Sequence, residues 1–69
     1  MDALRRRLGN NIKQARRKRG LSQQQVAENA HLDLTSVNEI ENGRRNPSLE
    51  TLARLAKVLE VSPHELLKP

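Results

Sequence analysis

No cysteine occurs among the 69 residues of this chain, and this absence restricts how so short a chain can hold a fold. Disulfide bonds and thiolate metal sites are both excluded, and two isolated histidines cannot build a structural zinc site. A chain of this size buries only roughly 60% of the surface that its unfolded form exposes. The sequence therefore predicts one domain, residues 1–69, that is held by its hydrophobic core alone.

The spacing of apolar residues predicts that this domain is all-α. A first helix is expected over residues 3–18, because its apolar residues are spaced by four, four and three. Four further helices are expected where a capping residue precedes apolar residues at helical spacing. Those capping residues are Ser22, Asp33, Ser48 and Ser62.

The second and third helices are expected to be short and close together. Ser22 and Gln25 have the spacing of a capping box, and Asp33 suits the N-cap of the next helix. Only His31 and Leu32 separate the two helices, which leaves room for a tight turn and not for a linker. Residues 42–47, with a glycine and an Asn-Pro step, are expected to form a loop.

Charge is distributed unevenly along the chain, and this favours a polyanionic partner. Residues 1–20 carry eight basic groups and one acid, a local charge of +7, whereas residues 21–43 carry four acids and no base, a charge of −4. A basic segment of this density attracts phosphates, although it is also compatible with a merely solvated helix face.

The complete absence of Phe, Trp and Tyr narrows the kind of polyanion. Modules that bind single-stranded DNA or RNA stack bases on aromatic side chains. Double-stranded DNA, contacted through its backbone and groove edges, is therefore the better fit.

Six stretches of the chain together form a recognisable pattern: Ile12–Arg16, Gly20–Gln23, Val26–Ala27, Val37–Gly43, Pro47–Leu49 and Leu59–Ser62. This pattern resembles the phage repressor and Cro type of helix-turn-helix regulators, also called the XRE type. The resemblance implies a five-helix, lambda-repressor-like bundle in which residues 22–43 form the helix-turn-helix, with its second helix in the major groove of DNA. It also implies a transcriptional regulator that acts as a repressor-like dimer on a pseudo-palindromic operator.

Base-reading residues are expected on the outer face of the third helix. Because Val37 and Ile40 should face the core, the opposite face presents four residues to the groove. These are Leu34, Thr35, Asn38 and Glu39. Asn38 is suited to adenine, and Glu39 could accept from the amino group of cytosine, although many relatives carry a basic residue or Gln there.

Other site residues follow from the resemblance. It implies phosphate or minor-groove contacts at the start of the second helix and in the loop after the third, by Ser22, Gln23, Asn42, Arg44 and Arg45. It also implies a structural ion pair between Arg16 and Glu41, which the position of Arg16 beside the apolar stripe allows. His31 stands where the family commonly has glycine, so some backbone strain is expected.

No cofactor, metal ion or enzymatic activity is expected, since neither a nucleophile motif nor a phosphate-binding glycine loop is present. No apolar run is long enough to span a membrane, and the basic first helix lacks the aromatic residues of a membrane-surface helix. The expected location is the cytoplasm of a prokaryotic cell or phage-infected host, in association with the nucleoid.

Two alternatives to a dimeric repressor remain open. The acidic middle segment is compatible with an antitoxin-like or other protein-interaction module that binds DNA secondarily, with a protein as its main partner. The chain could also be the N-terminal domain of a longer regulator. Self-association of the chain is expected to use apolar residues near the C-terminus, such as Val58 or Leu66.

Overall fold

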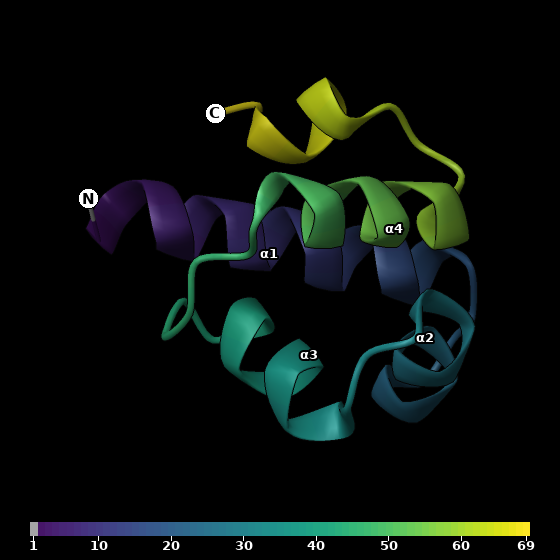
Figure 1. Ribbon diagram of the computed structural model, residues 1–69. Helices are drawn as coiled ribbons and strands as arrows, with labels where there is room; N and C mark the ends of the chain where they lie inside the picture. Colours follow the sequence, from purple (N-terminus) through teal and green to yellow (C-terminus); the bar gives the residue numbers. More distant parts are fainter. Residues whose placement is uncertain (1) are drawn as a thin grey trace.

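Helices account for all regular secondary structure in residues 2–69, the part of the chain that the computed structural model describes (Figure 1). The all-α prediction is therefore confirmed. The elements are α1 (Asp2–Lys18), α2 (Gln23–Ala30), α3 (Leu34–Glu41), α4 (Leu49–Leu59) and the 3₁₀ helix η1 (Pro63–Leu67).

The predicted count of five α-helices is not confirmed, because the last segment forms the 3₁₀ helix η1. This segment is only five residues long, and Lys68 directly after it is extended, with φ −64° and ψ 146°. Short segments favour the 3₁₀ form, whose hydrogen bonds join residues three apart and need fewer residues to close. The start of the segment is as expected: the N–H of Ser62 donates to Glu65 Oε1 at 2.9 Å.

The predicted N-caps Ser22 and Asp33 begin α2 and α3, the two helices that a tight turn connects. Ser22 Oγ accepts from the N–H of Gln25 at 3.0 Å, and Gln25 Oε1 accepts from the N–H of Ser22 at 2.8 Å. Asp33 Oδ1 accepts from the N–H of Ser36 at 2.7 Å. Between the caps, His31 ends α2 in the left-handed conformation, with φ 58°. A residue with a Cβ is strained in that region, which agrees with the strain expected for His31 at a position where the family commonly has glycine.

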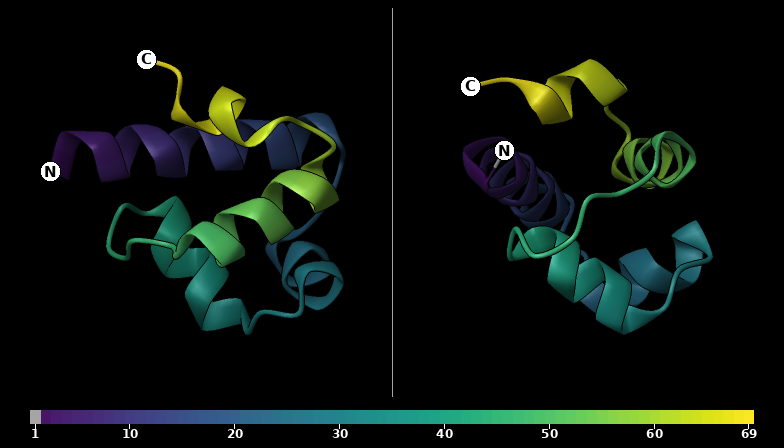
Figure 2. Two further views of the ribbon diagram at one scale, coloured as in Figure 1. Left: turned by 45° about the horizontal axis from the view of Figure 1, so that its top comes forward. Right: turned by 60° about the vertical axis from the view of Figure 1, so that its left-hand side comes forward.

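The helices pack in layers around one core. α1 and α4 lie side by side in the middle, with η1 on one side of them and α2 and α3 on the other (Figure 2). Every element contributes buried apolar side chains, since each helix has one apolar face. The core consists of Leu8, Ile12, Val26, Ala27, Ala30, Val37, Ile40, Leu52, Leu55, Ala56, Leu59 and Leu66.

The position of Leu66 corrects one prediction. Its side chain is only 2% exposed, so it belongs to the core and is not available for self-association. The reason is that η1 packs against α1 and α4, which turns Leu66 inward. Val58 is also partly buried against the core. Leu49, which is 85% exposed, and Leu67, which is 42% exposed, are the large apolar residues of α4 and η1 that remain exposed.

Gly9 lets α1 approach the end of α3 very closely. A Cβ atom at Gly9 would lie 2.5 Å from the carbonyl oxygens of both Ile40 and Glu41. Backbone oxygens cannot move aside without displacing α3, so only glycine fits at this crossing. The close approach brings the last turn of α3 against the middle of α1.

Candidate nucleic-acid interface

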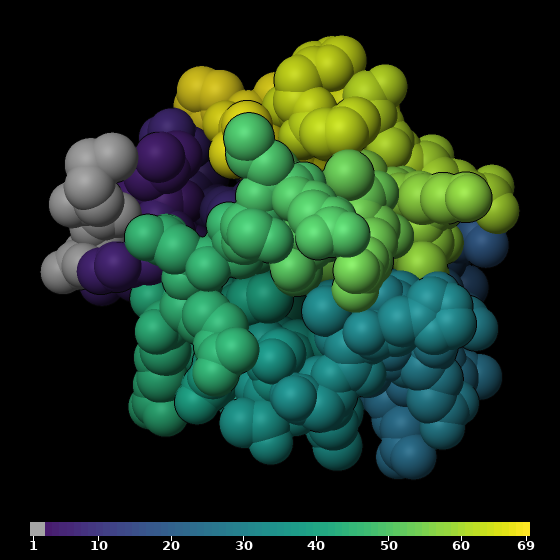
Figure 3. All heavy atoms as spheres, viewed as in Figure 1, coloured from purple at the N-terminus to yellow at the C-terminus, as the bar shows by residue number. Residues whose placement is uncertain are grey.

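One face of the molecule collects the residues that the sequence associates with DNA. α2, α3 and the loop after α3 form a continuous lower surface in the space-filling view (Figure 3). On α3, Leu34 is 46% exposed, Thr35 and Asn38 are exposed, and Glu39 is half-buried. The structure therefore places all four predicted base-reading residues at the surface of the same short helix.

Beneath this surface, Arg16 of α1 and Glu41 of α3 form a buried ion pair. Arg16 Nε lies 2.7 Å from Glu41 Oε2, and Arg16 Nη2 lies 3.1 Å from Glu41 Oε1. Their side chains are 12% and 0% exposed. Arg16 Nη1 also donates to the carbonyl oxygen of Leu21 at 2.9 Å, so the same guanidinium holds the segment that leads into α2.

Amide side chains connect this ion pair to the outer face of α3. Gln23 Nε2, at the start of α2, donates to Glu41 Oε1 at 2.9 Å, and Asn38 Nδ2 donates to Gln23 Oε1 at 3.3 Å. Asn42 Nδ2 donates to the Oδ1 of Asn38 at 3.3 Å and to its carbonyl oxygen at 3.0 Å. Gln23 and Asn42 thus orient the side chain of Asn38 from two sides. From the sequence, these three residues were predicted only as separate contacts to DNA.

A second arginine–glutamate pair lies on α3 itself. Arg45 folds back from the loop, so that its Nε lies 2.9 Å and its Nη2 2.8 Å from Glu39 Oε1. Arg45 Nη1 donates to Ser36 Oγ at 3.0 Å. Hydrogen bonds from the backbone and side chain of Ser36 lower the pKa of Asp33 below its ordinary value, and the positive charge of Arg45 makes a smaller contribution in the same direction.

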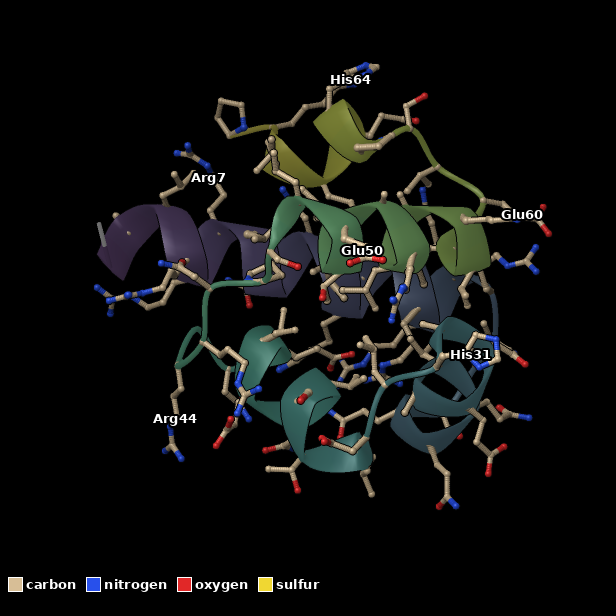
Figure 4. The ribbon with its side chains drawn as sticks, in the orientation of Figure 1. Arg7, His31, Arg44, Glu50, Glu60 and His64 are labelled. Carbon is tan, nitrogen blue, oxygen red and sulfur yellow. The ribbon has the colours of Figure 1, made fainter. Side chains whose placement is uncertain are left out.

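Arg44 behaves differently from its neighbour Arg45. Its side chain makes no hydrogen bond or ion pair with the rest of residues 2–69, and it extends outward from the loop (Figure 4). The two adjacent arginines, both predicted from the sequence as phosphate or minor-groove contacts, therefore have different environments. Arg44 is therefore open to a ligand, whereas Arg45 is held against α3.

Three residues of α1 extend this surface, and the sequence did not single them out as a group. Arg6, Asn10 and Lys13 line a hollow of about 150 Å³ together with Glu41 and Asn42. Their spacing of four and three residues places them on one face of α1, and this spacing could have grouped them from the sequence. Their position beside Asn42 depends on the crossing of α1 and α3, which residue spacing within α1 does not specify.

Metal and membrane features are not found in the described chain. Residues 2–69 contain no group of three His, Cys, Asp or Glu side chains that could hold a metal ion. No helix within the same range has the length and apolar character that crossing a bilayer requires.

The fold and its surface define the class of this protein: an all-α bundle with a helix-turn-helix formed by α2 and α3. A helix-turn-helix family model matches residues 12–66, and the chain belongs to that family. It is 38% identical over 66 residues to the uncharacterized HTH-type transcriptional regulator y4dJ of Sinorhizobium fredii, a match that covers 96% of this chain and 86% of that protein.

Solved structures agree with this assignment. The restriction-modification controller protein C.AhdI from Aeromonas hydrophila superposes with a TM-score of 0.86 at 36% identity, covering 88% of this chain and 92% of that one. SinR, the master regulator for biofilm formation, solved in complex with DNA, superposes with a TM-score of 0.83 at 39% identity, covering 88% and 98%. The chain spans about half of some longer curated relatives, for example 55% of full-length SinR of Bacillus subtilis.

Proposed function

We propose that this protein is a sequence-specific transcriptional regulator that binds double-stranded DNA, with α3 in the major groove and α2 across the sugar-phosphate backbone. The observation that carries the proposal is the orientation of Asn38 on the exposed face of α3 by Gln23 and Asn42. A side chain fixed by its neighbours before binding loses less entropy when it contacts a base.

The hydrogen-bonding groups that Asn38 retains are those that adenine requires. One N–H of its amide donates to Gln23, and its Oδ1 accepts one bond from Asn42, which leaves one N–H and one lone pair. Adenine offers N7 as an acceptor and the N6 amino group as a donor in the major groove. We propose that Asn38 reads adenine, with Leu34, Thr35 and Glu39 contacting neighbouring base edges.

Phosphate contacts in this proposal surround the base-reading face. The side chain of Gln23 is engaged by Glu41 and Asn38, so its backbone N–H at the positive N-terminus of α2, next to Ser22, is the better phosphate donor. Arg44 and Asn42 contact phosphates on the other side. The hollow lined by Arg6 and Lys13 adds two cations next to Asn42.

The acidic charge of the helix-turn-helix does not oppose this proposal. Of its four acids, Glu41 is buried against Arg16, and Glu39 is paired with Arg45. Two acids that motivated a protein-interaction role are therefore neutralised within the fold. A protein partner is the alternative, and of the acidic charge only that of Glu28 and Asp33 still supports it.

We further propose that residues 1–69 bind DNA as one domain and as a homodimer. A single copy presents few base contacts, whereas two copies on half-sites one helical turn apart would double them. The exposed Leu49 and Leu67 are candidates for the contact between copies. The cytoplasm of a prokaryotic cell or phage-infected host is the corresponding location.

Selection of bound sequences from a random duplex pool tests the proposal. Wild type should enrich a pseudo-palindromic sequence, and Asn38→Ala should lose the adenine preference, at a cost of about 1–3 kcal/mol for the selected site. Arg44→Ala should weaken all sequences and reduce the slope of log K against log salt by roughly 0.9. If wild type enriches no sequence, the regulator proposal fails and a protein partner becomes the better hypothesis.

A further inference from the structure

The Glu39–Arg45 pair lies on the outer surface of α3 and remains accessible. The side chains of Glu39 and Arg45 are 36% and 49% exposed, so neither is enclosed by the fold. Val37 and Ile40 of α3 face the core, and Glu39 projects from the other side of this helix. The pair is therefore part of the face proposed to enter the major groove.

Arg45 keeps a specific set of hydrogen-bond donors. Its guanidinium has five N–H groups, of which Nε–H donates to Glu39 Oε1 and one on Nη1 donates to Ser36 Oγ, while Nη2 lies 2.8 Å from Glu39 Oε1. Each terminal nitrogen therefore keeps at least one N–H that makes no hydrogen bond to residues 2–69. These two donors belong to one planar group, and two adjacent acceptors are what such a fork recognises.

Glu39 keeps a complementary acceptor. Arg45 occupies Oε1 of the carboxylate, whereas Oε2 accepts no hydrogen bond from residues 2–69. The accessible pair thus retains N–H donors on both terminal nitrogens of Arg45 and an acceptor on Glu39.

The major-groove edge of a G·C base pair has the opposite pattern. Guanine presents two acceptors, N7 and O6, and cytosine next to it presents the donor N4 amino group. We propose that Glu39 and Arg45 form one unit that reads a G·C base pair, with Arg45 donating to guanine and Glu39 accepting from cytosine. This inference rests on the proposed DNA-binding function and specifies which base pair one part of α3 prefers.

The environment of Arg45 favours this role over a phosphate contact. A phosphate would have to compete with Glu39, which already compensates the charge of Arg45. The neighbouring Arg44 has no such partner and extends outward, so it is the better phosphate ligand (Figure 4). The bonds to Glu39 and Ser36 also hold the guanidinium in a fixed orientation, which suits a directional contact with a base.

Arg45→Lys is the sharpest test, because lysine keeps the charge but loses the planar fork. In random-pool selection, wild type should enrich a G·C pair at one position in each half-site, and the variant should lose that preference. Its affinity for the selected duplex should fall about tenfold relative to wild type, which corresponds to one lost bidentate contact. A duplex in which A·T replaces that pair should bind wild type and variant equally.

Matched variants separate the roles of the partners. Arg44→Lys makes the same change one residue earlier and should leave the G·C preference intact. Glu39→Gln should relax the preference without abolishing binding, since a neutral amide no longer holds Arg45. Circular dichroism melting checks that each variant is folded, and all three positions are exposed or half-buried.

The outcomes distinguish the inference from the function on which it rests. If wild type enriches a sequence but Arg45→Lys selects the same G·C pair, the inference is overturned and DNA binding stands. Equal weakening on all sequences by Arg45→Lys and Arg44→Lys would likewise overturn it, since both would then be phosphate ligands. If wild type enriches nothing, the proposed function fails, and the inference with it.

Discussion

Helix α3 carries two glutamates that each pair with an arginine from another segment, and the two pairs differ mainly in burial. Glu41 pairs with Arg16 inside the molecule, where the side chains are 0% and 12% exposed. Glu39 pairs with Arg45 on the surface, where they are 36% and 49% exposed. The comparison teaches that one chemical group on one helix can hold the fold or remain available for a ligand, depending on solvent access.

The buried pair is coupled to the structure around it. Arg16 also donates to the Leu21 carbonyl, and Glu41 also accepts from Gln23, so α1, α2 and α3 meet at this pair. Removing either partner would leave the other charge buried without compensation. The surface pair lacks this constraint because water can replace either partner.

The largest expected effect is that of Glu41→Ala. We expect it to destabilise the fold by about 3–5 kcal/mol, because the guanidinium of Arg16 would lose its buried partner. Thermal unfolding should show a Tm lowered by more than about 10 °C. Glu39→Ala is the matched control on the same helix, and it should cost at most about 1 kcal/mol. A Tm of Glu41→Ala within a degree of wild type would contradict the distinction between the two pairs.

An intermediate effect is expected at Gly9, which sets the distance between α1 and the end of α3. Gly9→Ala would bring a methyl group to 2.5 Å from the carbonyl oxygens of Ile40 and Glu41. We expect a loss of about 1–3 kcal/mol from overpacking, measured by urea unfolding. Gly20→Ala is a useful control, since nothing lies within 4 Å of its Cβ position and only its left-handed φ of 69° opposes the change. Wild-type stability of Gly9→Ala would show that α1 can shift freely.

The smallest expected effect concerns pH and Asp33, next to the surface pair. Hydrogen bonds from Ser36, with a contribution from Arg45, lower the pKa of this carboxylate in the folded state. A lowered pKa means that the charged form stabilises the fold above the ordinary pKa, and that this contribution is lost as pH falls below about 4. The free energy of unfolding, measured with urea, should therefore fall more steeply in acid for wild type than for Asp33→Asn. The asparagine side chain can cap α3 but does not titrate. Parallel acid profiles of the two proteins would refute this role of Asp33.

Much of the fold could be predicted because its signals are local. The caps Ser22 and Asp33 and the apolar spacing of α1 act within a few residues, so they define helix starts without tertiary information. The fifth helix was wrong in type because its five residues lie at the border between α and 3₁₀ geometry. Leu66 was wrongly expected at a contact between copies, because residue spacing in so short a segment does not show whether a side chain faces the core or solvent. Packing of η1 against α1 turns it into the core.

The candidate site was predictable as a set of residues but not as a network. Asn38 and Gln23 were identified separately, whereas their hydrogen bond depends on the angle between α2 and α3. From the sequence, Arg44 and Arg45 received the same predicted role, phosphate or minor-groove contact, because they are adjacent and of the same residue type. Their difference arises from the path of the loop, which returns one of them to Glu39.

The sequence by itself determined the helices, their order and the amphipathic faces that bury the core, since these depend on periodicity and on caps that act within one turn. It also determined that a basic α1 precedes an acidic helix-turn-helix. The resemblance to a known family had already named Arg16 and Glu41 as a pair, whereas the tertiary structure decided how deeply this pair is buried and that Arg45 returns to Glu39 at the surface. The physical reason is that the energy of a charge depends on its access to water, and access depends on how separate helices cross.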